Sequence, residues 1–206
     1  MAAKDLESLT WRREHSGRSF LISTQPAMLD LDFINTAFAT DDMDWAQRLP
    51  EEQLKTMISY SINVGLYEVL PPVPPPATAS EPSSPQTPSP TTDGPLEEKP
   101  KQIGYTRLMT DHVTTVYLTD VYVSSEYRSL SLGKWLISCC NEAIELHPHL
   151  RRALLFVTGE IGKRFYSAFG FWDIAEEEGK TIMTRKAFRG SSSGDKAAAI
   201  EGELGG

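Results

Sequence analysis

Eleven of the chain's 14 prolines lie between Pro71 and Pro100, in a stretch that contains no aromatic residue. Such a segment cannot bury enough apolar surface to offset the entropy lost on ordering, so residues 71–100 are predicted to be a disordered insertion. A folded domain must therefore be built from the sequence on both sides, with the two ends of the insertion close together. The prolines of residues 71–76 are also typical of a polyproline II ligand for an SH3- or WW-type partner, although a tolerated insertion is the simpler interpretation.

The rest of the 206-residue chain is long enough for one domain, which we place at residues 1–189, followed by a flexible tail at 190–206. The net charge of -8 argues against a nucleic-acid-binding surface and suits a cationic acceptor such as an amine. The charged N-terminal region and the lack of an apolar run of about 18 residues predict a soluble, cytoplasmic protein that binds no membrane. Composition leaves open whether the protein is a monomer or a homodimer.

The two cysteines of the chain, Cys139 and Cys140, are neighbours within an apolar pattern of helical spacing. Adjacent cysteines rarely form a disulfide with each other, and nothing around them has the spacing of metal ligands. We therefore interpret them as small core residues in a reducing compartment, and we predict no metal site.

Outside the insertion, strand patterns alternate with helix patterns. Strands are expected at residues 19–24, 63–70, 102–109, 115–123, 153–157, 171–174 and 181–186. Helices are expected at residues 30–39, 51–62, 132–144 and 163–169. The unbroken apolar run of residues 153–157 is typical of a strand buried on both faces. This order predicts an α/β fold class of the α+β kind, in which helices flank a mixed, mostly antiparallel sheet.

Residues 117–134 read as a strand that leads through a short loop into an amphipathic helix. The free N–H groups of the first helical turn and the positive end of the helix dipole point toward such a loop, where an anion such as a pyrophosphate can bind. Arg128 and Lys134 add positive charge at the same end. Many strand–loop–helix units bind no ligand, so this pattern alone is a weak indication of function.

This segment resembles the cofactor loop of the GNAT acetyltransferase superfamily, in which an Arg or Gln is followed by two residues, a Gly, one residue, and a Gly or Ala. Four residues separate Val123 from Arg128, as in that family, and Gly133 fills the last position of the motif. Residues 165–171, Phe-Tyr-Ser-Ala-Phe-Gly-Phe, resemble a second family signature, an apolar-Tyr pair followed by Gly-Phe. The likeness covers about residues 19–187 without the insertion, and is greatest to bacterial and fungal members that have no assigned substrate.

The resemblance implies a GNAT fold whose sheet opens in a V-shaped cleft, with acetyl-CoA as the cosubstrate. The backbone of Val121, Tyr122 and Val123 would bind the pantetheine arm and polarise the thioester carbonyl. The backbone N–H groups of the loop and the first helical turn would bind the pyrophosphate; these residues are Arg128, Ser129, Leu130, Ser131, Leu132, Gly133 and Lys134.

Two serines depart from the family motif. Ser131 stands where the first motif glycine is found, and Ser129 where a further glycine is common. A serine places a Cβ near the phosphate oxygens, but its hydroxyl can also donate a hydrogen bond to them. We expect the hydroxyl of Ser131 to contribute to CoA binding, because serine also suits the start of a helix.

Asp120 interrupts a run of strand-forming residues, where a carboxylate is costly unless it has a partner or a task. In the resemblance it falls where glucosamine-phosphate acetyltransferases carry an acidic active-site residue, which implies that it holds the acceptor amine or accepts its proton.

Tyr166, in the second signature, is implied to be the general acid for the leaving thiolate, although spacing alone would make it a core aromatic. Trp45 and Trp135 are most simply core residues, and His112 is most simply part of a hairpin turn.

The favoured function is an acetyl-CoA-dependent N-acetyltransferase that acts on a primary amine, most simply that of a small molecule. We expect direct attack of the neutral amine on the thioester, with Asp120 and Tyr166 as catalytic residues and backbone N–H groups stabilising the oxyanion. The sequence leaves three alternatives open: a pseudoenzyme that binds acetyl-CoA, an interaction protein that acts through its proline-rich segment, and a protein-lysine acetyltransferase.

Overall fold

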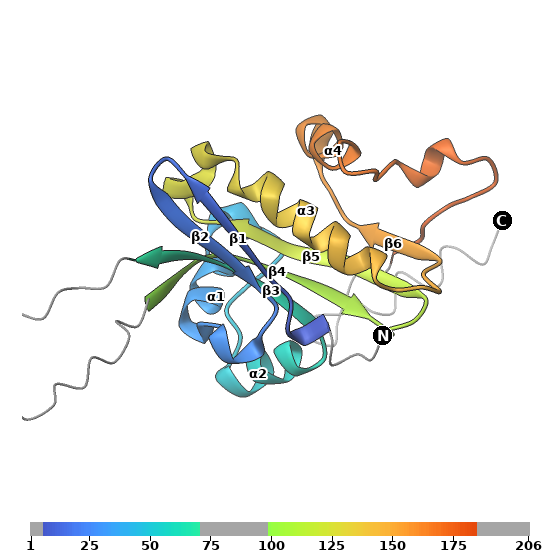
Figure 1. Cartoon of the computed structure of the whole chain (residues 1–206). Coiled ribbons are helices and arrows are strands. Elements are labelled where there is room, and N and C mark those ends of the chain that lie inside the picture. Colours follow the sequence, from blue (N-terminus) through green and yellow to red (C-terminus); the bar gives the residue numbers. More distant parts are fainter. Residues whose placement is uncertain (1–5, 71–98, 185–206) are drawn as a thin grey trace, which may run out of the picture.

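The computed structural model describes residues 6–70 and 99–184 of the chain and contains one mixed sheet flanked by helices (Figure 1). The strands are β1 (Thr10–His15), β2 (Arg18–Ser23), β3 (Ile62–Leu70), β4 (Lys99–Thr110), β5 (Thr115–Val123) and β6 (Arg152–Leu155). The helices are α1 (Leu31–Ala37), α2 (Glu51–Ser59), α3 (Leu132–Glu145) and α4 (Gly159–Ser167), with 3-10 helices η2 (Pro26–Met28), η3 (Asp41–Met43), η4 (Ser125–Leu130) and η5 (Ile174–Glu176). The strand order is β1-β2-β3-β4-β5-β6, antiparallel as far as β5 and parallel between β5 and β6. The predicted mixed α/β class is confirmed.

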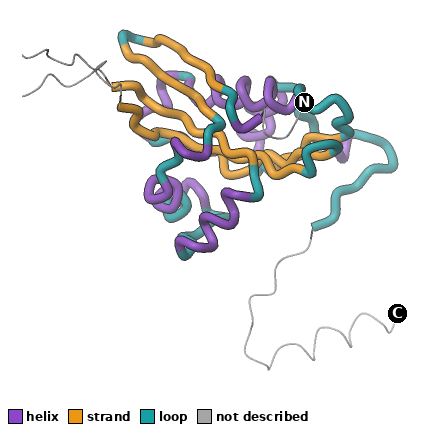
Figure 2. Tube along the Cα trace, turned by 60° about the horizontal axis from the view of Figure 1, so that its bottom comes forward, coloured by secondary structure: helices purple, strands orange, loops and turns teal. Residues whose placement is uncertain are grey.

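Helices lie on both faces of the sheet (Figure 2). Each face has its own apolar core. On one face, α3 presents Leu136 and Ile137 to apolar side chains of β2 to β5. On the other face, α1 and α2 present Ile34 and Leu54 to a cluster that includes Tyr105 of β4. Each helix has an apolar stripe at helical spacing, so burial of that stripe holds the layers together.

Side-chain hydrogen bonds set the limits of the first two helices. The carboxylate of Asp30 caps α1 by accepting from the amide of Phe33 at 3.0 Å. The predicted second helix is too long at its C-terminal end, because the side-chain amide of Asn63 donates to the carbonyl oxygens of Ile58 and Ser61 at 2.8 Å each. These bonds satisfy carbonyl groups at the end of α2 and let the chain enter β3 at residue 62.

The β3–β4 hairpin carries the predicted insertion in its connection. Leu70 and Lys99 are Cα partners at the open end of this hairpin, so the two ends of the insertion lie side by side, as expected. The insertion is two residues shorter than predicted, because Lys99 and Pro100 pair with Leu70 and Val69 as part of the sheet. Residues 71–98, including the polyproline II stretch, lie outside the described residues, as does the tail at 190–206.

β1 is an outer strand that the sequence patterns do not predict. Its residues alternate between exposed and partly exposed and lack the apolar face of an ordinary half-buried strand. Antiparallel pairing holds it to β2, from Thr10 opposite Ser23 to His15 opposite Arg18. The indole N–H of Trp11 donates to Glu142 of α3 at 2.6 Å, which ties β1 to the α3 face.

The C-terminal part of the described chain differs most from the sequence prediction. β6 is the outer strand of the sheet and only half-buried, and Phe156 after it is exposed, so the prediction of a strand buried on both faces is wrong. The strand expected at residues 171–174 is wrong, because 171–173 are loop and Ile174 begins η5; the strand expected at 181–186 is wrong for 181–184, while 185 and 186 lie outside the described residues. Ion pairs of Lys163 with Asp173 (2.8 Å) and of Arg152 with Glu177 (2.9 Å) hold the chain after α4 in a loop.

The predictions about cysteines, metals and membranes concern the same described residues. Cys139 and Cys140 are buried free thiols in the core beneath α3, as predicted, and burial raises the pKa of Cys139 to about 12. No helix within residues 6–70 and 99–184 is long and apolar enough to cross a membrane. Within those ranges, no group of three or more His, Cys, Asp or Glu side chains is placed to hold a metal ion.

Candidate active site

The sheet opens along the second half of β5. β6 pairs with β5 only at residues 115–118, whereas β4 stays paired with β5 as far as Val123. In the described part of the chain, residues 119–123 therefore have no strand partner on the β6 side. A cleft lies along this edge, closed on its other side by the start of α4; its lining residues are Asp42, Val121, Tyr122, Val123, Arg128, Ile161, Gly162 and Phe165. The three β5 residues predicted to bind a pantetheine arm thus line one cleft together with the predicted loop arginine.

A β-bulge sets the direction of the Asp120 side chain. Arg107 pairs with Thr119 and Tyr105 with Tyr122, so two residues of β5 face a single residue of β4 between these pairs. Asp120 takes a left-handed backbone conformation there, with a φ of 56°, which Asp tolerates better than most residues. Its carboxylate lies on the α1/α2 side of the sheet and is 7% exposed.

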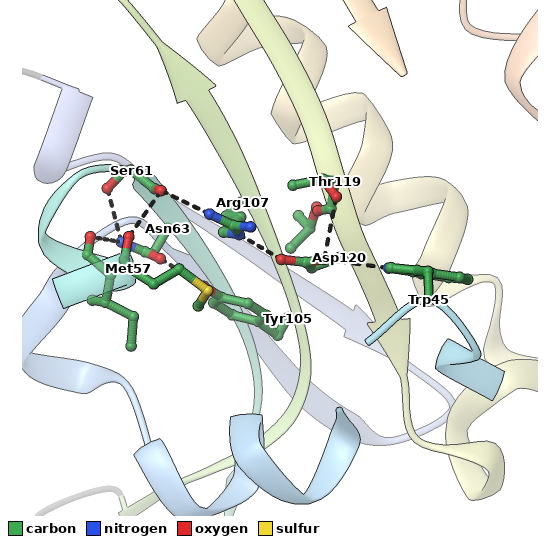
Figure 3. A network of polar contacts seen from close by, with 10 residues as sticks. Trp45, Met57, Ser61, Asn63, Tyr105, Arg107, Thr119 and Asp120 are labelled. Atoms are coloured by element: carbon green, nitrogen blue, oxygen red, sulfur yellow. Dashed lines mark hydrogen bonds and ion pairs between the residues drawn. The ribbon is translucent and has the colours of Figure 1, made fainter. Parts of the chain in front are cut away.

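The Asp120 carboxylate is the centre of a polar network (Figure 3). The Nε–H of Arg107 donates to Oδ2 in a buried ion pair, and the Nη1 of Arg107 donates to the hydroxyl of Ser61 at 3.3 Å. At the other oxygen, Oδ1 accepts from the hydroxyl of Thr119 at 3.2 Å and from the indole N–H of Trp45 at 3.4 Å. The positive charge of Arg107 offsets the cost of burying this carboxylate and fixes its orientation.

Trp45 is not a core residue, contrary to the sequence prediction. Its side chain is 59% exposed, in the connection between α1 and α2, while its indole nitrogen reaches inward to Asp120. A tryptophan carries one polar N–H that needs a partner, and here that partner is the buried carboxylate. Trp45 therefore stands between Asp120 and the solvent. Trp135 is half-buried against the α3 core, close to the prediction.

Arg128 fixes the loop between β5 and α3 at the mouth of the cleft. Its Nε–H donates to the carbonyl of Val123 at 3.0 Å, and its two Nη atoms pair with the carboxylate of Asp42 at 3.2 and 2.7 Å. This two-pronged bond holds the pKa of Asp42 below its ordinary value and joins η4 to the α1–α2 connection. Arg128 is about half exposed. It therefore both holds the loop in place and adds positive charge at the mouth of the cleft.

Ser131 occupies a backbone conformation that favours glycine. Its φ is 56°, it directly precedes α3, and its side chain makes no capping hydrogen bond. The expectation that this serine supports the helix start through its hydroxyl is therefore wrong. The first helical amide with an intrahelical acceptor is that of Trp135, which donates to the carbonyl of Ser131 at 3.3 Å. Among the described residues, the N–H groups of residues 132–134 are then the donors of the first turn that have no backbone acceptor.

The remaining predicted loop residues differ in exposure. Ser129, Ser131 and Lys134 are exposed, Leu130 and Gly133 are half-buried, and Leu132 is buried in the α3 core. Backbone groups are thus the parts of Leu132 that remain available to a ligand, as the resemblance implies.

Tyr166 lies on α4 and packs against the α3 core. Its ring contacts Phe165 at 5.0 Å and Phe171 at 6.2 Å between centroids, both nearly perpendicular. Burial raises the pKa of its hydroxyl to about 12. The neighbouring Phe165, rather than Tyr166, lines the cleft beside β5, and the described residues show no direct contact between Tyr166 and Asp120. Asp120 therefore lies at the unpaired edge of β5. Tyr166 does not line the cleft, but it directly follows a residue that does, Phe165.

Sequence reasoning missed several residues of this site, among them Arg107, Asp42 and Phe165. The signal for Arg107 was available in principle, because it sits in a strand of mainly apolar and β-branched residues, as Asp120 does. Asp42 belongs to an acidic run, Asp41-Asp42-Met43-Asp44, that reads as a solvated surface unless its partner 86 residues further on is known.

Comparison with known proteins agrees with this geometry. A family model described as "Acetyltransferase (GNAT) domain" matches residues 96–173. A Gibberella zeae protein named "Putative acetyltransferase FG08082" is 36% identical over 160 residues, which cover 78% of this chain and 83% of that protein. A solved structure from Xanthomonas campestris, titled as a "putative acetyltransferase belonging to the gnat family", is 24% identical with a TM-score of 0.53, over 82% of this chain and 93% of that one, and supports the fold. The chain belongs to the GNAT acetyltransferase family.

Proposed function

We propose that the protein is an acetyl-CoA-dependent N-acetyltransferase whose acceptor is the primary amine of a small molecule. The observation that carries this proposal is the unpaired edge of β5 at residues 119–123, which shares a cleft with Arg128 and includes the buried carboxylate of Asp120. Membership of the GNAT family supports acetyl transfer. The net charge of -8 favours a cationic acceptor over an anionic one.

The residues of the cleft fit acetyl-CoA in chemical type. Residues 121–123 have no strand partner on the β6 side, so backbone groups on that side match the amide groups of a pantetheine arm, and Ile161 and Phe165 offer apolar contact opposite them. The N–H groups of residues 132–134 and the positive end of α3 suit a pyrophosphate. Bound acetyl-CoA would supply the acetyl group as an activated thioester.

In the proposed reaction the amine nitrogen forms a C–N bond to the acetyl carbon, the C–S bond breaks, one proton leaves the nitrogen and one reaches the sulfur. That balance holds for the neutral amine. An alkylamine is mostly protonated at neutral pH, so Asp120 holds the ammonium and accepts one additional proton before the attack, directly or through water, and this proton then passes to solvent. Tyr166 donates the proton that the sulfur needs and regains one from solvent. A phenol with a pKa of about 12 stays protonated at neutral pH and is therefore available as a donor.

The test is a calorimetric titration of the purified chain with acetyl-CoA, followed by incubation with small primary amines and, separately, with lysine-containing histone peptides. We expect saturable binding and acetylation of at least one small amine, detected as product mass. Acetylation of peptides alone would replace the small-molecule acceptor with a protein lysine. Binding without turnover would favour the pseudoenzyme, and a chain that does not bind acetyl-CoA would overturn the proposal.

A further inference from the structure

A second buried carboxylate lies outside the cleft, on β3. Glu68 is 8% exposed, and groups from two other elements reach its two oxygens. The Nε–H of Arg18, from β2, donates to Oε1 at 2.5 Å, and the hydroxyl of Tyr127, from η4, donates to Oε2 at 2.8 Å. The ion pair with Arg18 holds the pKa of Glu68 below its ordinary value, so the carboxylate is ionised and a strong acceptor at neutral pH.

Tyr127 is held at this place by its ring as well as by its hydroxyl. The side chain is 3% exposed, and the guanidinium of Arg18 lies 4.8 Å from the ring centroid. The ammonium of Lys101, from β4, lies 5.7 Å from the same centroid and 3.4 Å from the hydroxyl. Burial, together with the bond to Glu68, raises the pKa of Tyr127, so the phenol remains a donor to the carboxylate. Residues from β2, β3, β4 and η4 thus meet at one phenol.

This cluster bears on the candidate site because Tyr127 lies in the loop that enters α3. The amide of Tyr127 donates to the carbonyl of Ser124 at 2.9 Å, and the next residue, Arg128, bonds Val123 and Asp42 at the cleft. Tyr127 therefore attaches the loop to β3 through Glu68, while Arg128 attaches it to Val123 and Asp42 at the cleft. A tilt of η4 about this anchor would move Ser131 and the unpaired N–H groups that follow it.

We propose that Glu68 is a positioning residue for the pyrophosphate-binding loop and acts through Tyr127. The inference rests on the proposed function, because it assigns the loop 125–131 to acetyl-CoA. The Arg18 side chain is 39% exposed, so its ion pair with Glu68 contributes little net stability, whereas it fixes the direction of the carboxylate that accepts from Tyr127. The bond that it directs here ends on the loop that leads into the N–H groups of residues 132–134, the proposed pyrophosphate site.

The experiment compares two acetyl donors in the full chain. S-acetylpantetheine carries the thioester and the pantetheine arm but no pyrophosphate, so it does not use the loop. For E68Q and for Y127F we expect the Kd for acetyl-CoA to rise about tenfold, the loss of one hydrogen bond to a charged acceptor. Turnover with subsaturating S-acetylpantetheine should stay at the wild-type level.

Three controls separate positioning from a general loss of structure. E142Q removes a carboxylate that also accepts from an aromatic side chain of another element, Trp11. It should change neither the Kd for acetyl-CoA nor the turnover with S-acetylpantetheine. The double variant E68Q/Y127F should lose no more acetyl-CoA affinity than the stronger single variant, because both changes break the same bond. Y127F removes only a hydroxyl, so it keeps the test possible if E68Q does not fold.

The outcomes of this experiment are distinct. An equal loss with both donors would make Glu68 a structural residue and overturn the proposal, as would an unchanged Kd for acetyl-CoA in both variants. A wild-type chain without acetyl-CoA binding would overturn the proposed function instead, and this inference with it.

Discussion

Asp120 and Glu68 are alike in burial and charge and differ in what surrounds them. Each carboxylate belongs to a sheet strand, each is paired with an arginine, and their side chains are 8% and 11% exposed. The second oxygen of Asp120 meets the indole of a largely exposed tryptophan, Trp45, whereas that of Glu68 meets a phenol that is itself buried.

The two carboxylates are about equally buried, so the difference lies in the neighbours that contact them. Asp120 is bonded to the indole of an exposed side chain beside the unpaired edge of β5, whereas Glu68 is bonded to a buried phenol of the loop that enters α3. A buried carboxylate is therefore not by itself a mark of catalysis, and the groups that surround it must be considered as well. We expect loss of Asp120 to affect the chemical step and loss of Glu68 to affect cosubstrate binding.

The largest effect is expected for D120N. If the carboxylate handles the proton of the acceptor, turnover should fall about 10²-fold or more while the Kd for acetyl-CoA stays unchanged. D44N, in the exposed part of the α1–α2 connection, is the matched control and should keep wild-type turnover. Wild-type turnover in D120N would mean that Asp120, like Glu68, has no part in the chemical step. In the D120N background, a further R107M change should cost little more, because Arg107 acts on Asp120.

Y166F comes next, with an expected fall in turnover of about 10²-fold and unchanged acetyl-CoA binding. The hydroxyl is the group that donates to the leaving sulfur in the proposed reaction, and its removal leaves the ring packing against Phe165 and Phe171 intact. Y60F, at an exposed tyrosine, is the control. Full turnover in Y166F would return Tyr166 to the role of a core aromatic.

S131G tests the loop that Glu68 is proposed to position. Ser131 lies at the end of this loop, directly before α3. Glycine takes the left-handed conformation of residue 131 without strain, so the free energy of unfolding should rise by about 0.5 to 1 kcal/mol in thermal or urea unfolding. Acetyl-CoA binding should tighten, because the Cβ is removed and no capping bond is lost. Weaker binding would mean that the hydroxyl bonds a phosphate oxygen, as the sequence had suggested.

A pH series of the free energy of unfolding, measured for wild type and E68Q, tests the charge of Glu68. The pKa of Glu68 is lowered, chiefly by its hydrogen bond with Arg18, so its contribution to stability is present above the unfolded-state pKa of about 4.3 and is lost as pH falls through the folded-state value. The difference in free energy of unfolding between wild type and E68Q should be constant from pH 7 to about pH 5. It should shrink on further acidification. A difference that grows toward acid pH would contradict the assignment of the ion pair.

The smallest effect is expected from shortening the β3–β4 hairpin. Leu70 and Lys99 are direct partners, so an Asn-Gly turn in place of residues 71–98 suits the strand ends. The free energy of unfolding should change by less than about 0.5 kcal/mol, and the Kd for acetyl-CoA should not change. Glu68 lies two residues from this junction, so weaker acetyl-CoA binding would show that the cluster depends on the connection. A stability loss above about 2 kcal/mol would mean that the removed segment packs on the domain.

The order of elements could be predicted because periodicity and turn residues act locally. The β5–loop–α3 unit and the position of the hairpin follow from residues near in sequence, and so does Asp120, whose carboxylate stands out in a β-branched run. Glu68 stands in an equally apolar strand, but its partners lie 50 residues before it and 59 after it. A polar residue near a strand end resembles one that is leaving the core, so the pattern of the strand alone did not reveal it.

Two errors at the ends of the sheet have a similar origin. β1 has few apolar residues because an outer strand is held mainly by its backbone pairing. The segment after Phe171 has strand-forming residues, yet residues 172–177 lie off the sheet edge and make ion pairs there, of Asp173 with Lys163 and of Glu177 with Arg152. Long-range charge pairs of this kind compete with local propensity, which contributes only about 1 kcal/mol across its whole range.

The burial of Cys139 and Cys140 has a practical consequence for measurement. They are the only cysteines in the sequence, both are almost fully inaccessible, and burial raises the pKa of each thiol, so neither offers an exposed thiolate. A chromogenic disulfide reagent added to the folded protein should therefore report the sulfhydryl of released CoA with almost no background from the enzyme. For the same reason, a cysteine introduced on the surface, for example in place of Ser129, would be the single site for a fluorescent maleimide without removal of the native pair.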